Sequence, residues 1–268
     1  MDTRFWGPSG WKLLHLICAE PAHDNHAHDN HALAEFFQTI PYILPCKFCR
    51  ASLTDYYRQH PFSAKGRMIP TLDLPKWMYT IHNCVSAKLK KQGLPVSPAP
   101  TFASVKATYD RLLQCPWQEQ LAYCWDFLFS VGYHHPKESF RQMEPMEGCP
   151  KEVYHCQDAC EKNKWNVLPQ RERARWFRRF WAALPDALPS TIRPHWKSLQ
   201  EQHPPTLDCR RSTLAWLWRM RCGLERGFAD PYTSVCQSLA RYSSDCGRKK
   251  GAITCRRVRS RKTKKRTT

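Results

Sequence analysis

Apolar residues recur at helical spacing along the first 115 residues of the chain. Between residues 6 and 18, Trp11, Leu14, His15 and Cys18 fall at i, i+3, i+4 and i+7, which is one face of a helix. Proline and glycine residues punctuate the pattern where helices begin and end. No run alternates between apolar and polar residues as a strand would. The pattern predicts an all-α fold, with helices over residues 6–18, 33–40, 46–60, 76–92 and 102–113.

The chain changes character after Pro116, where tryptophan becomes frequent on the apolar faces. Trp176, Phe177, Phe180 and Trp181 form one such face. Helical spacing continues over residues 116–133, 150–167, 169–184, 190–203, 205–227 and 231–243. We therefore expect a first domain over residues 1–115, a second helical domain over 116–247, and a basic tail over 248–268 that its composition predicts to be disordered.

Composition and charge narrow the class of protein. Hydrophobic residues make up 42% of the 268 residues and charged residues 24%, which excludes an intrinsically disordered chain. No apolar run reaches the roughly 18–20 residues of a membrane helix. Asp2 and Pro8 interrupt the amino-terminal segment, where a secretory signal needs continuous apolar residues. We expect neither a membrane anchor nor a secretory signal, and so an intracellular protein.

The net charge of +19 is concentrated at one end of the chain. Residues 248–268 hold 11 lysines and arginines and no acidic residue. Such a tail favours contact with nucleic acid or an anionic membrane surface, or a role as a nuclear localisation signal. It has no aromatic side chain to stack on bases, so nucleic-acid binding there would be non-specific. A solvated tail without a specific partner is the alternative.

Cysteine is abundant, with 14 residues in the chain. Without a secretory signal, so many cysteines indicate metal or redox chemistry rather than an extracellular disulfide framework. Cys46 and Cys49 form a CxxC motif directly after Pro45, where a helix is predicted to begin. The amide groups of a helix start stabilise a thiolate, which suits disulfide exchange. Zinc binding, for which the first 115 residues hold no second cysteine pair, and an inert pair remain as alternatives.

Four segments in this order resemble the Erv/ALR family of FAD-linked sulfhydryl oxidases, and most closely the forms encoded by large DNA viruses. They read WGPSGWKLLH from residue 6, LPCKFCRASLTDYY from 44, WMYTIHNCVSAKLKK from 77 and PTFASVKATYD from 100. Each segment alone is weak evidence, whereas the set is specific. The resemblance covers residues 5–111. We know no family that resembles residues 116–268.

The resemblance implies a four-helix bundle with a short fifth helix that binds FAD. It implies a thiol oxidase that forms disulfides in protein substrates, passes electrons from a dithiol through Cys46–Cys49 to FAD and then to O2, and releases H2O2. Cys49 would be the sulfur next to the flavin, and Cys46 the outer, accessible sulfur that the substrate attacks. Family members form homodimers, and viral members act in the host cytoplasm or the virion. The rival hypothesis is a basic, zinc-stapled helical protein that binds nucleic acid.

The resemblance also assigns residues to the FAD site. The positions that match its cofactor contacts are Gly7, Trp11, His15, His82, Asn83, Val85, Ser86, Leu89, Lys91 and Tyr109. Lys91 would pair with the diphosphate as a point charge. Two positions depart from the family motif, because Ser86 replaces an asparagine and Lys90 replaces a glycine.

Several other features offer further hypotheses. A tandem repeat, AHDNH, spans residues 22–31 and is either a transition-metal site or a tolerated insertion in a surface loop. The family pattern suggests a disulfide between Cys84 and Cys115 as a further hypothesis. Cys18 is expected to be a small buried apolar residue. Candidate shuttle pairs that would collect electrons from substrate are Cys156 with Cys160 and Cys246 with Cys255.

Overall fold

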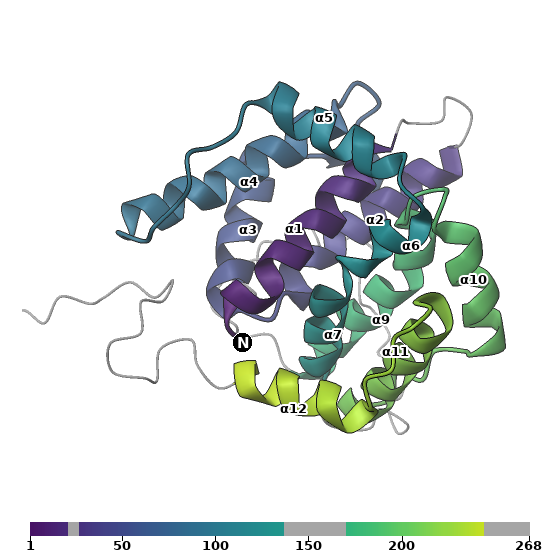
Figure 1. The fold of residues 1–268 in the computed structure, drawn as a ribbon. Coiled ribbons are helices and arrows are strands. Elements are labelled where there is room, and N and C mark those ends of the chain that lie inside the picture. Colours follow the sequence, from purple (N-terminus) through teal and green to yellow (C-terminus); the bar gives the residue numbers. More distant parts are fainter. Residues whose placement is uncertain (21–26, 137–169, 244–268) are drawn as a thin grey trace, which may run out of the picture.

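The computed structural model describes residues 1–20, 27–136 and 170–243. Within these ranges the chain is almost entirely helical, which confirms the predicted all-α class. The first 115 residues form α1 (Thr3–Ala19), α2 (Ala27–Ile43), α3 (Lys47–Gln59), α4 (Leu74–Lys91) and α5 (Phe102–Leu113) (Figure 1).

Two local predictions for this part of the chain were wrong. The helix expected to begin at residue 33 begins at Ala27, so the second copy of the AHDNH repeat belongs to α2 rather than to a loop. A short antiparallel hairpin, β1 (Ser63–Ala64) with β2 (Arg67–Met68), lies where no strand was expected. Its turn places Lys65 and Gly66 at positive φ, and these strands are too short to produce a visible alternation.

Side-chain caps fix the starts of three helices. Asp2 accepts a hydrogen bond from the backbone N–H of Arg4 at the start of α1 (2.9 Å). Asp73 accepts from Lys76 at the start of α4 (3.0 Å), and Thr101 accepts from Ser104 at the start of α5 (3.2 Å). Each cap satisfies a backbone donor that the helix itself leaves without a partner.

The second part of the chain supplies α6 (Trp117–Ala122), α7 (Trp125–Tyr133), α9 (Gln170–Ala187), α10 (Arg193–Gln202), α11 (Arg210–Leu224) and α12 (Tyr232–Ser243). The single helix expected over 116–133 is divided into α6 and α7 at Tyr123 and Cys124. The helix expected over 150–167 and the basic tail lie outside the described residues.

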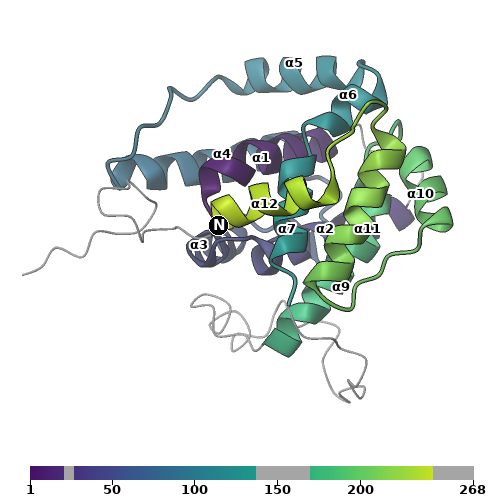
Figure 2. The same ribbon diagram turned by 60° about the horizontal axis from the view of Figure 1, so that its bottom comes forward.

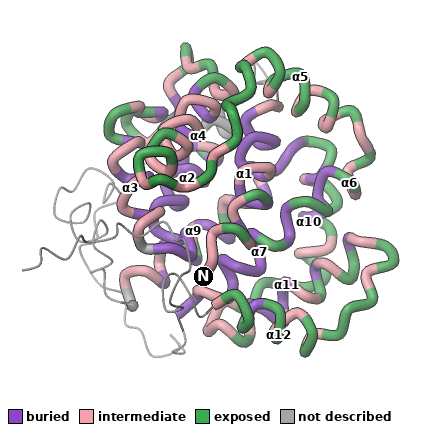
Figure 3. The backbone as a smooth tube through the Cα atoms, turned by 60° about the vertical axis from the view of Figure 1, so that its left-hand side comes forward, coloured by how far each residue is buried: buried purple, intermediate pink, exposed green. Residues whose placement is uncertain are grey.

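The two parts of the chain pack into one hydrophobic core. Helix α1 packs against α4, α5 and α7, and α2 packs against α3 and α9. The buried side chains of both parts form a single cluster. Figure 3 colours the buried positions of the backbone purple, and they occur in helices of both parts. The family resemblance ends at residue 111, and the division at residue 115 stays a prediction as a domain boundary.

Polar contacts also join the two parts. The Ser9 hydroxyl on α1 accepts a hydrogen bond from the backbone N–H of Phe127 on α7 (3.0 Å). Arg179 on α9 binds both carboxylate oxygens of Glu35 on α2. At the amino end of α1, the backbone N–H of Asp2 donates to the carbonyl of Tyr242 on α12 (3.0 Å). Helix α12 therefore lies beside the start of α1 (Figure 2).

Gly10 provides a test of this packing. A Cβ atom at Gly10 would lie 2.9 Å from Cδ2 of Phe127, whereas a Cβ at Gly7, on the same helix, would meet nothing within 4 Å. We expect Gly10→Ala to lower the unfolding free energy by about 1–3 kcal/mol, because the ring of Phe127 is held in the core. Gly7→Ala, the matched control, should keep or raise it. Urea denaturation of both variants measures the difference, and equal stabilities would contradict this packing.

Candidate active site

The CxxC motif lies at the start of α3, as the sequence predicts. Cys46 is the N-cap residue, with an extended backbone (φ −118°, ψ 120°). Its carbonyl accepts hydrogen bonds from the backbone N–H groups of Cys49 (3.1 Å) and Arg50 (3.0 Å). Pro45 comes before the helix, and because proline disfavours a helical conformation at the residue that precedes it, the helix does not begin earlier in the chain. Both cysteines therefore lie within one turn at the positive end of the helix dipole.

Cys49 lines a cavity of about 510 Å³ that is enclosed mainly by α1, α3 and α4. Seven residues singled out from the sequence line it together: Gly7, Trp11, Cys49, His82, Val85, Leu89 and Tyr109. They come from four helices and are up to 102 positions apart in the chain, which no single motif relates. The volume falls in the roughly 300–1,000 Å³ range of ligand sites.

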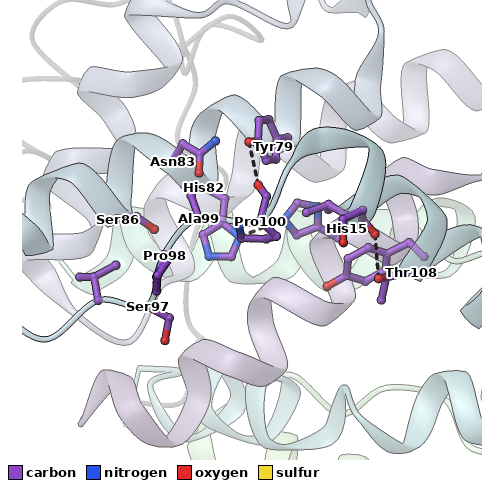
Figure 4. A pocket seen from close by; sticks show the side chains of 14 residues that line it. His15, Tyr79, His82, Asn83, Ser86, Ser97, Pro98, Ala99, Pro100 and Thr108 are labelled. Carbon is purple, nitrogen blue, oxygen red and sulfur yellow. Dashed lines mark hydrogen bonds between the residues drawn. The ribbon is translucent and has the colours of Figure 1, made fainter.

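A second cavity of about 430 Å³ adjoins the first between α4, α5 and the extended segment 96–100. His15, Asn83 and Ser86 line it, and His82 and Tyr109 line both cavities. Figure 4 shows the rings of His15 and His82 at this cavity, with Asn83 and Ser86 further along α4. Because the two cavities share His82 and Tyr109, we treat them as two chambers of one site.

A stack of rings separates the two chambers. The rings of Trp11 and His82 lie nearly parallel, with centroids 3.9 Å apart, and His15 stacks on Tyr109 at 4.9 Å. Nε2 of His15 and Nδ1 of His82 are 3.0 Å apart, so one ring donates a hydrogen bond to the other. That arrangement requires at least one of the two rings to be neutral.

Burial determines the protonation of these side chains. It lowers the pKa of His15 to about 3, assisted by repulsion from His82, and it lowers the pKa of His82 to about 4. Burial also raises the pKa of Tyr109 to about 12. At neutral pH the wall between the chambers is therefore uncharged.

Two predicted residues lie elsewhere than the resemblance implies. Cys46 is only 3% exposed, which contradicts the expectation that the outer sulfur is accessible, because this N-cap residue packs into the hydrophobic core. Lys91 is exposed and lines neither cavity. The α4 lysine that lines the larger cavity is Lys88, one turn earlier, whose Nζ donates to the hydroxyl of Ser52 (2.6 Å).

The comparisons with known proteins agree with this geometry. The model of the Erv1 / Alr family matches residues 8–109. A protein of Invertebrate iridescent virus 6 that is named as an FAD-linked sulfhydryl oxidase, 347L, is 31% identical over 107 residues, which cover 37% of this chain and 92% of that protein. The chain belongs to the Erv1/Alr family.

Two further relatives of the same printed activity come from other large DNA viruses. The FAD-linked sulfhydryl oxidases of Invertebrate iridescent virus 3 and Acanthamoeba polyphaga mimivirus are each 28% identical over 94 residues, or 35% of this chain. The chain covers 62% and 65% of their lengths, which is less than two thirds. No solved structure matches this chain.

The residues of the two chambers fit the FAD that the Erv1/Alr family implies. Neither cavity is lined by an aspartate or glutamate, while Arg4, Lys12 and Lys88 line the larger one. Arg4 is paired with Asp2 (2.7 Å), so Lys12 and Lys88 are the cations that would face a diphosphate. A Cβ at Gly7 would enter open space, which leaves the backbone free for close approach. The indole Nε1 of Trp6, whose ring lines the same cavity, is buried and has no hydrogen-bond partner within the described structure.

Sequence reasoning missed Arg4, Trp6, Lys12 and Lys88 as lining residues of the site. Trp6 and Lys12 lie within the WGPSGWKLLH segment, but they fall five positions before and one position after Trp11, so helical periodicity from Trp11 does not place them on its face. Lys88 belongs to the same lysine-rich segment as Lys91, and no sequence signal distinguishes the two. Only the packing of α4 against α3 does so.

Other features stay separate from this site. Cys84 and Cys115 are free thiols, so the Cys84–Cys115 disulfide is not formed; the Cys84 sulfur lies 3.8 Å from Nε2 of His60. Cys18 is fully buried, as expected. Among the described residues, no three metal-ligating side chains lie together, and part of the AHDNH repeat falls outside them, as do both candidate shuttle pairs. No helix in the described ranges is long and apolar enough to cross a membrane.

Arg50 places a positive charge beside the CxxC motif. It is 3% exposed, and its Nη1 donates to the carbonyl of Leu44, just before the motif (2.6 Å). Burial lowers the pKa of Arg50 to about 9, and repulsion from Arg173 on α9 lowers it further, while Cys46 and Cys49 act in the opposite direction. Attraction to a cysteine thiolate thus stabilises both charges.

We expect Arg50→Gln to move the alkylation of the CxxC thiols to higher pH, because the neutral side chain no longer favours the thiolate. The pH dependence of iodoacetamide labelling of the reduced protein measures this shift. Arg50→Lys keeps the charge and should retain most of the original pH profile. Identical profiles for all three proteins would show that Arg50 only holds the segment at Leu44 in place.

Proposed function

We infer that this chain is an FAD-linked sulfhydryl oxidase that forms disulfides in protein substrates, through Cys46 and Cys49. The observation that supports the proposal most strongly is the position of Cys49, in the first turn of α3 and on the wall of a cavity it shares with Trp11 and His82. The viral relatives carry the same activity in their names. The comparisons do not support the rival hypothesis of a zinc-stapled nucleic-acid-binding protein.

The cysteines perform the first half of the reaction by thiol–disulfide exchange. A substrate thiolate attacks one sulfur of the Cys46–Cys49 disulfide, and the other sulfur leaves as a thiolate. The second substrate thiol then attacks the mixed disulfide, so the substrate is oxidised by two electrons and the CxxC pair is reduced. Arg50 favours the thiolate that leaves. We assign the attacked position to Cys46, which is only 3% exposed, so attack by a substrate thiolate requires that its sulfur become more exposed than it is in this structure.

The remaining site residues hold the cofactor. When bound here, FAD would supply the acceptor for the two electrons of the dithiol and their transfer to O2, giving H2O2. Gly7, Trp11, Val85 and Leu89 form the wall beside Cys49, and Lys88 is the nearest α4 cation for the diphosphate. His15, Asn83 and Ser86 provide polar groups in the second chamber for the rest of the dinucleotide.

The other partners follow from the remaining surfaces. Within this chain α9 covers one face of α2, so that face is not free for a second copy. A homodimer of this protein would therefore form through another face of the bundle. Helices α6, α7 and α9–α12 serve as a second helical domain that buttresses the oxidase helices. The basic tail provides non-specific, salt-sensitive contact with nucleic acid or another anionic surface.

The absorption spectrum of the purified protein, loaded with FAD if necessary, tests the proposal. A flavin band that bleaches with a dithiol under anaerobic conditions, and returns with O2 as peroxide forms, is the expected result. A protein that does not bind FAD, or whose bound flavin stays oxidised in excess dithiol, would contradict it.

A further inference from the structure

A second pair of cysteines lies outside the residues that match the family. Cys209 is the N-cap residue of α11 and Cys236 lies on α12, and both line one surface cavity of about 390 Å³. Both are free thiols and neither is fully buried. They are 27 positions apart in the chain, so only the packing of α12 beside α11 brings them to one cavity.

Tyr232 lines the same cavity as the two cysteines. It begins α12 one turn before Cys236, and burial raises the pKa of its hydroxyl to about 12, with Cys236 acting in the same direction. The same hydroxyl donates to the carbonyl of Arg211, two positions after Cys209 (3.4 Å). Tyr232 also lies close enough to Cys209 for the two side chains to influence each other's ionisation. The two sulfurs therefore border the same phenol.

Cys209 has the surroundings of a reactive thiolate. A hydrogen bond from the backbone N–H of Ser212 lowers the pKa of Cys209, the Ser212 hydroxyl and the backbone of Arg211 act in the same direction, and partial burial and Asp208 oppose them. The Ser212 Oγ lies 3.6 Å from the Cys209 sulfur. Cys209 also lies at the positive end of the dipole of α11, a helix of 15 residues, which stabilises its thiolate further.

Two arginines give the cavity its polarity. Arg210 and Arg211 line it, and no acidic residue does. The guanidinium of Arg210 stacks over the ring of Tyr133 at 4.5 Å, and its Nε is buried without a hydrogen-bond partner in the described structure. A peptide that carries a carboxylate beside its sulfur is the ligand that this combination of cations and thiols favours.

We propose that Cys209 and Cys236 form a second thiol–disulfide exchange site, which acts on disulfides of carboxylate-bearing peptides and does not involve the flavin cavity. The Cys209 thiolate attacks one sulfur of the substrate disulfide, forms a mixed disulfide and releases one substrate thiolate. Cys236 then attacks the Cys209 sulfur and releases the second. The substrate disulfide gains two electrons and takes the two protons of the cysteines, and a Cys209–Cys236 disulfide remains. A dithiol reverses the sequence.

The same helix offers a matched control. Cys222, on α11, is more exposed than Cys209, but burial raises its pKa. Trypsin places the three cysteines on separate peptides, 198–210, 222–226 and 227–241. Brief labelling of the reduced full-length protein with iodoacetamide at pH 7 should modify Cys209 about threefold faster than Cys222, or more, because only the thiolate reacts. Equal labelling, or faster labelling of Cys222, would overturn the proposal.

Oxidised glutathione, whose peptide carries two carboxylates, is the probe for the exchange reaction. Mass spectrometry after incubation should find peptides 198–210 and 227–241 joined by a disulfide, in the unaltered chain and in Cys46→Ser/Cys49→Ser alike. Cys236→Ser should instead trap glutathione on Cys209, whereas Cys222→Ser should change nothing. Glutathione that stays on Cys209 in the unaltered chain, with no linked peptides, would contradict the pair. Since no readout involves flavin, failure here is distinct from failure of the oxidase.

Discussion

Replacing Cys49 with serine is expected to reduce dithiol oxidation to the non-enzymatic rate while the protein keeps its fold and its cofactor. Cys49 is half-buried on the wall of the larger cavity, so the loss of one sulfur atom leaves the cavity's shape intact. Without it, the CxxC pair can neither form a disulfide nor be reduced by substrate. Loss of a nucleophile that acts as part of a catalytic unit costs roughly 10³-fold or more in turnover.

Peroxide release in the presence of a dithiol measures the effect, and the flavin absorbance of the purified variant shows whether FAD is retained. Cys115→Ser is a suitable control, because Cys115 is a free thiol at the end of α5 that lines neither chamber. Normal turnover in Cys49→Ser would move the chemistry to another cysteine pair. Loss of flavin together with activity would show that Cys49 shapes the cavity instead.

Acid is expected to destabilise the protein through the His15–His82 pair. Burial lowers the pKa of His15 to about 3 and that of His82 to about 4. Between these values and the unfolded pKa, the two rings stay neutral in the folded protein but bind protons in the unfolded chain. The resulting stability is present above the unfolded pKa of about 6.5 and is lost as the pH falls toward the folded values. At about 1.4 kcal/mol per pH unit for each ring, the loss reaches up to about 5 kcal/mol by pH 4.5.

Urea denaturation between pH 4.5 and 8 measures this dependence. His134 and His135 are also buried with lowered pKa values, so the unaltered protein alone does not isolate the pair. The comparison is therefore with His15→Asn/His82→Asn, which should be less stable at pH 8 but lose less stability on acidification. Parallel curves for the two proteins would mean that these rings remain accessible to protons in the folded state.

Much of the helical framework and of the catalytic motif was predictable from local sequence. Pro45 and the CxxC motif mark the start of α3, and α5 begins and ends at Phe102 and Leu113 as predicted. These boundaries depend on capping and proline chemistry, which act over a few residues. The seven cavity residues recognised from the family segments also line one site together.

What the sequence did not reveal depends on packing between distant segments. The burial of Cys46 depends on its neighbours in the core, and the approach of Arg173 to Arg50 depends on α9, which belongs to the part of the chain without a known family. Lys88 and Lys91 look alike in the sequence, and only the rotation of α4 decides which one lines the cavity. Likewise, no spacing rule relates Cys209 to Cys236.

The contact between Asp2 and Tyr242 bears on how this protein tolerates additions at its amino end. Met1 is only 6% exposed, and Phe5 stacks on Tyr242 with ring centroids 4.3 Å apart. A purification tag fused before Met1 must therefore displace α12 or tilt the first turn of α1, where Arg4 and Gly7 border the flavin cavity. Tags of this kind should yield protein that is folded but poor in flavin.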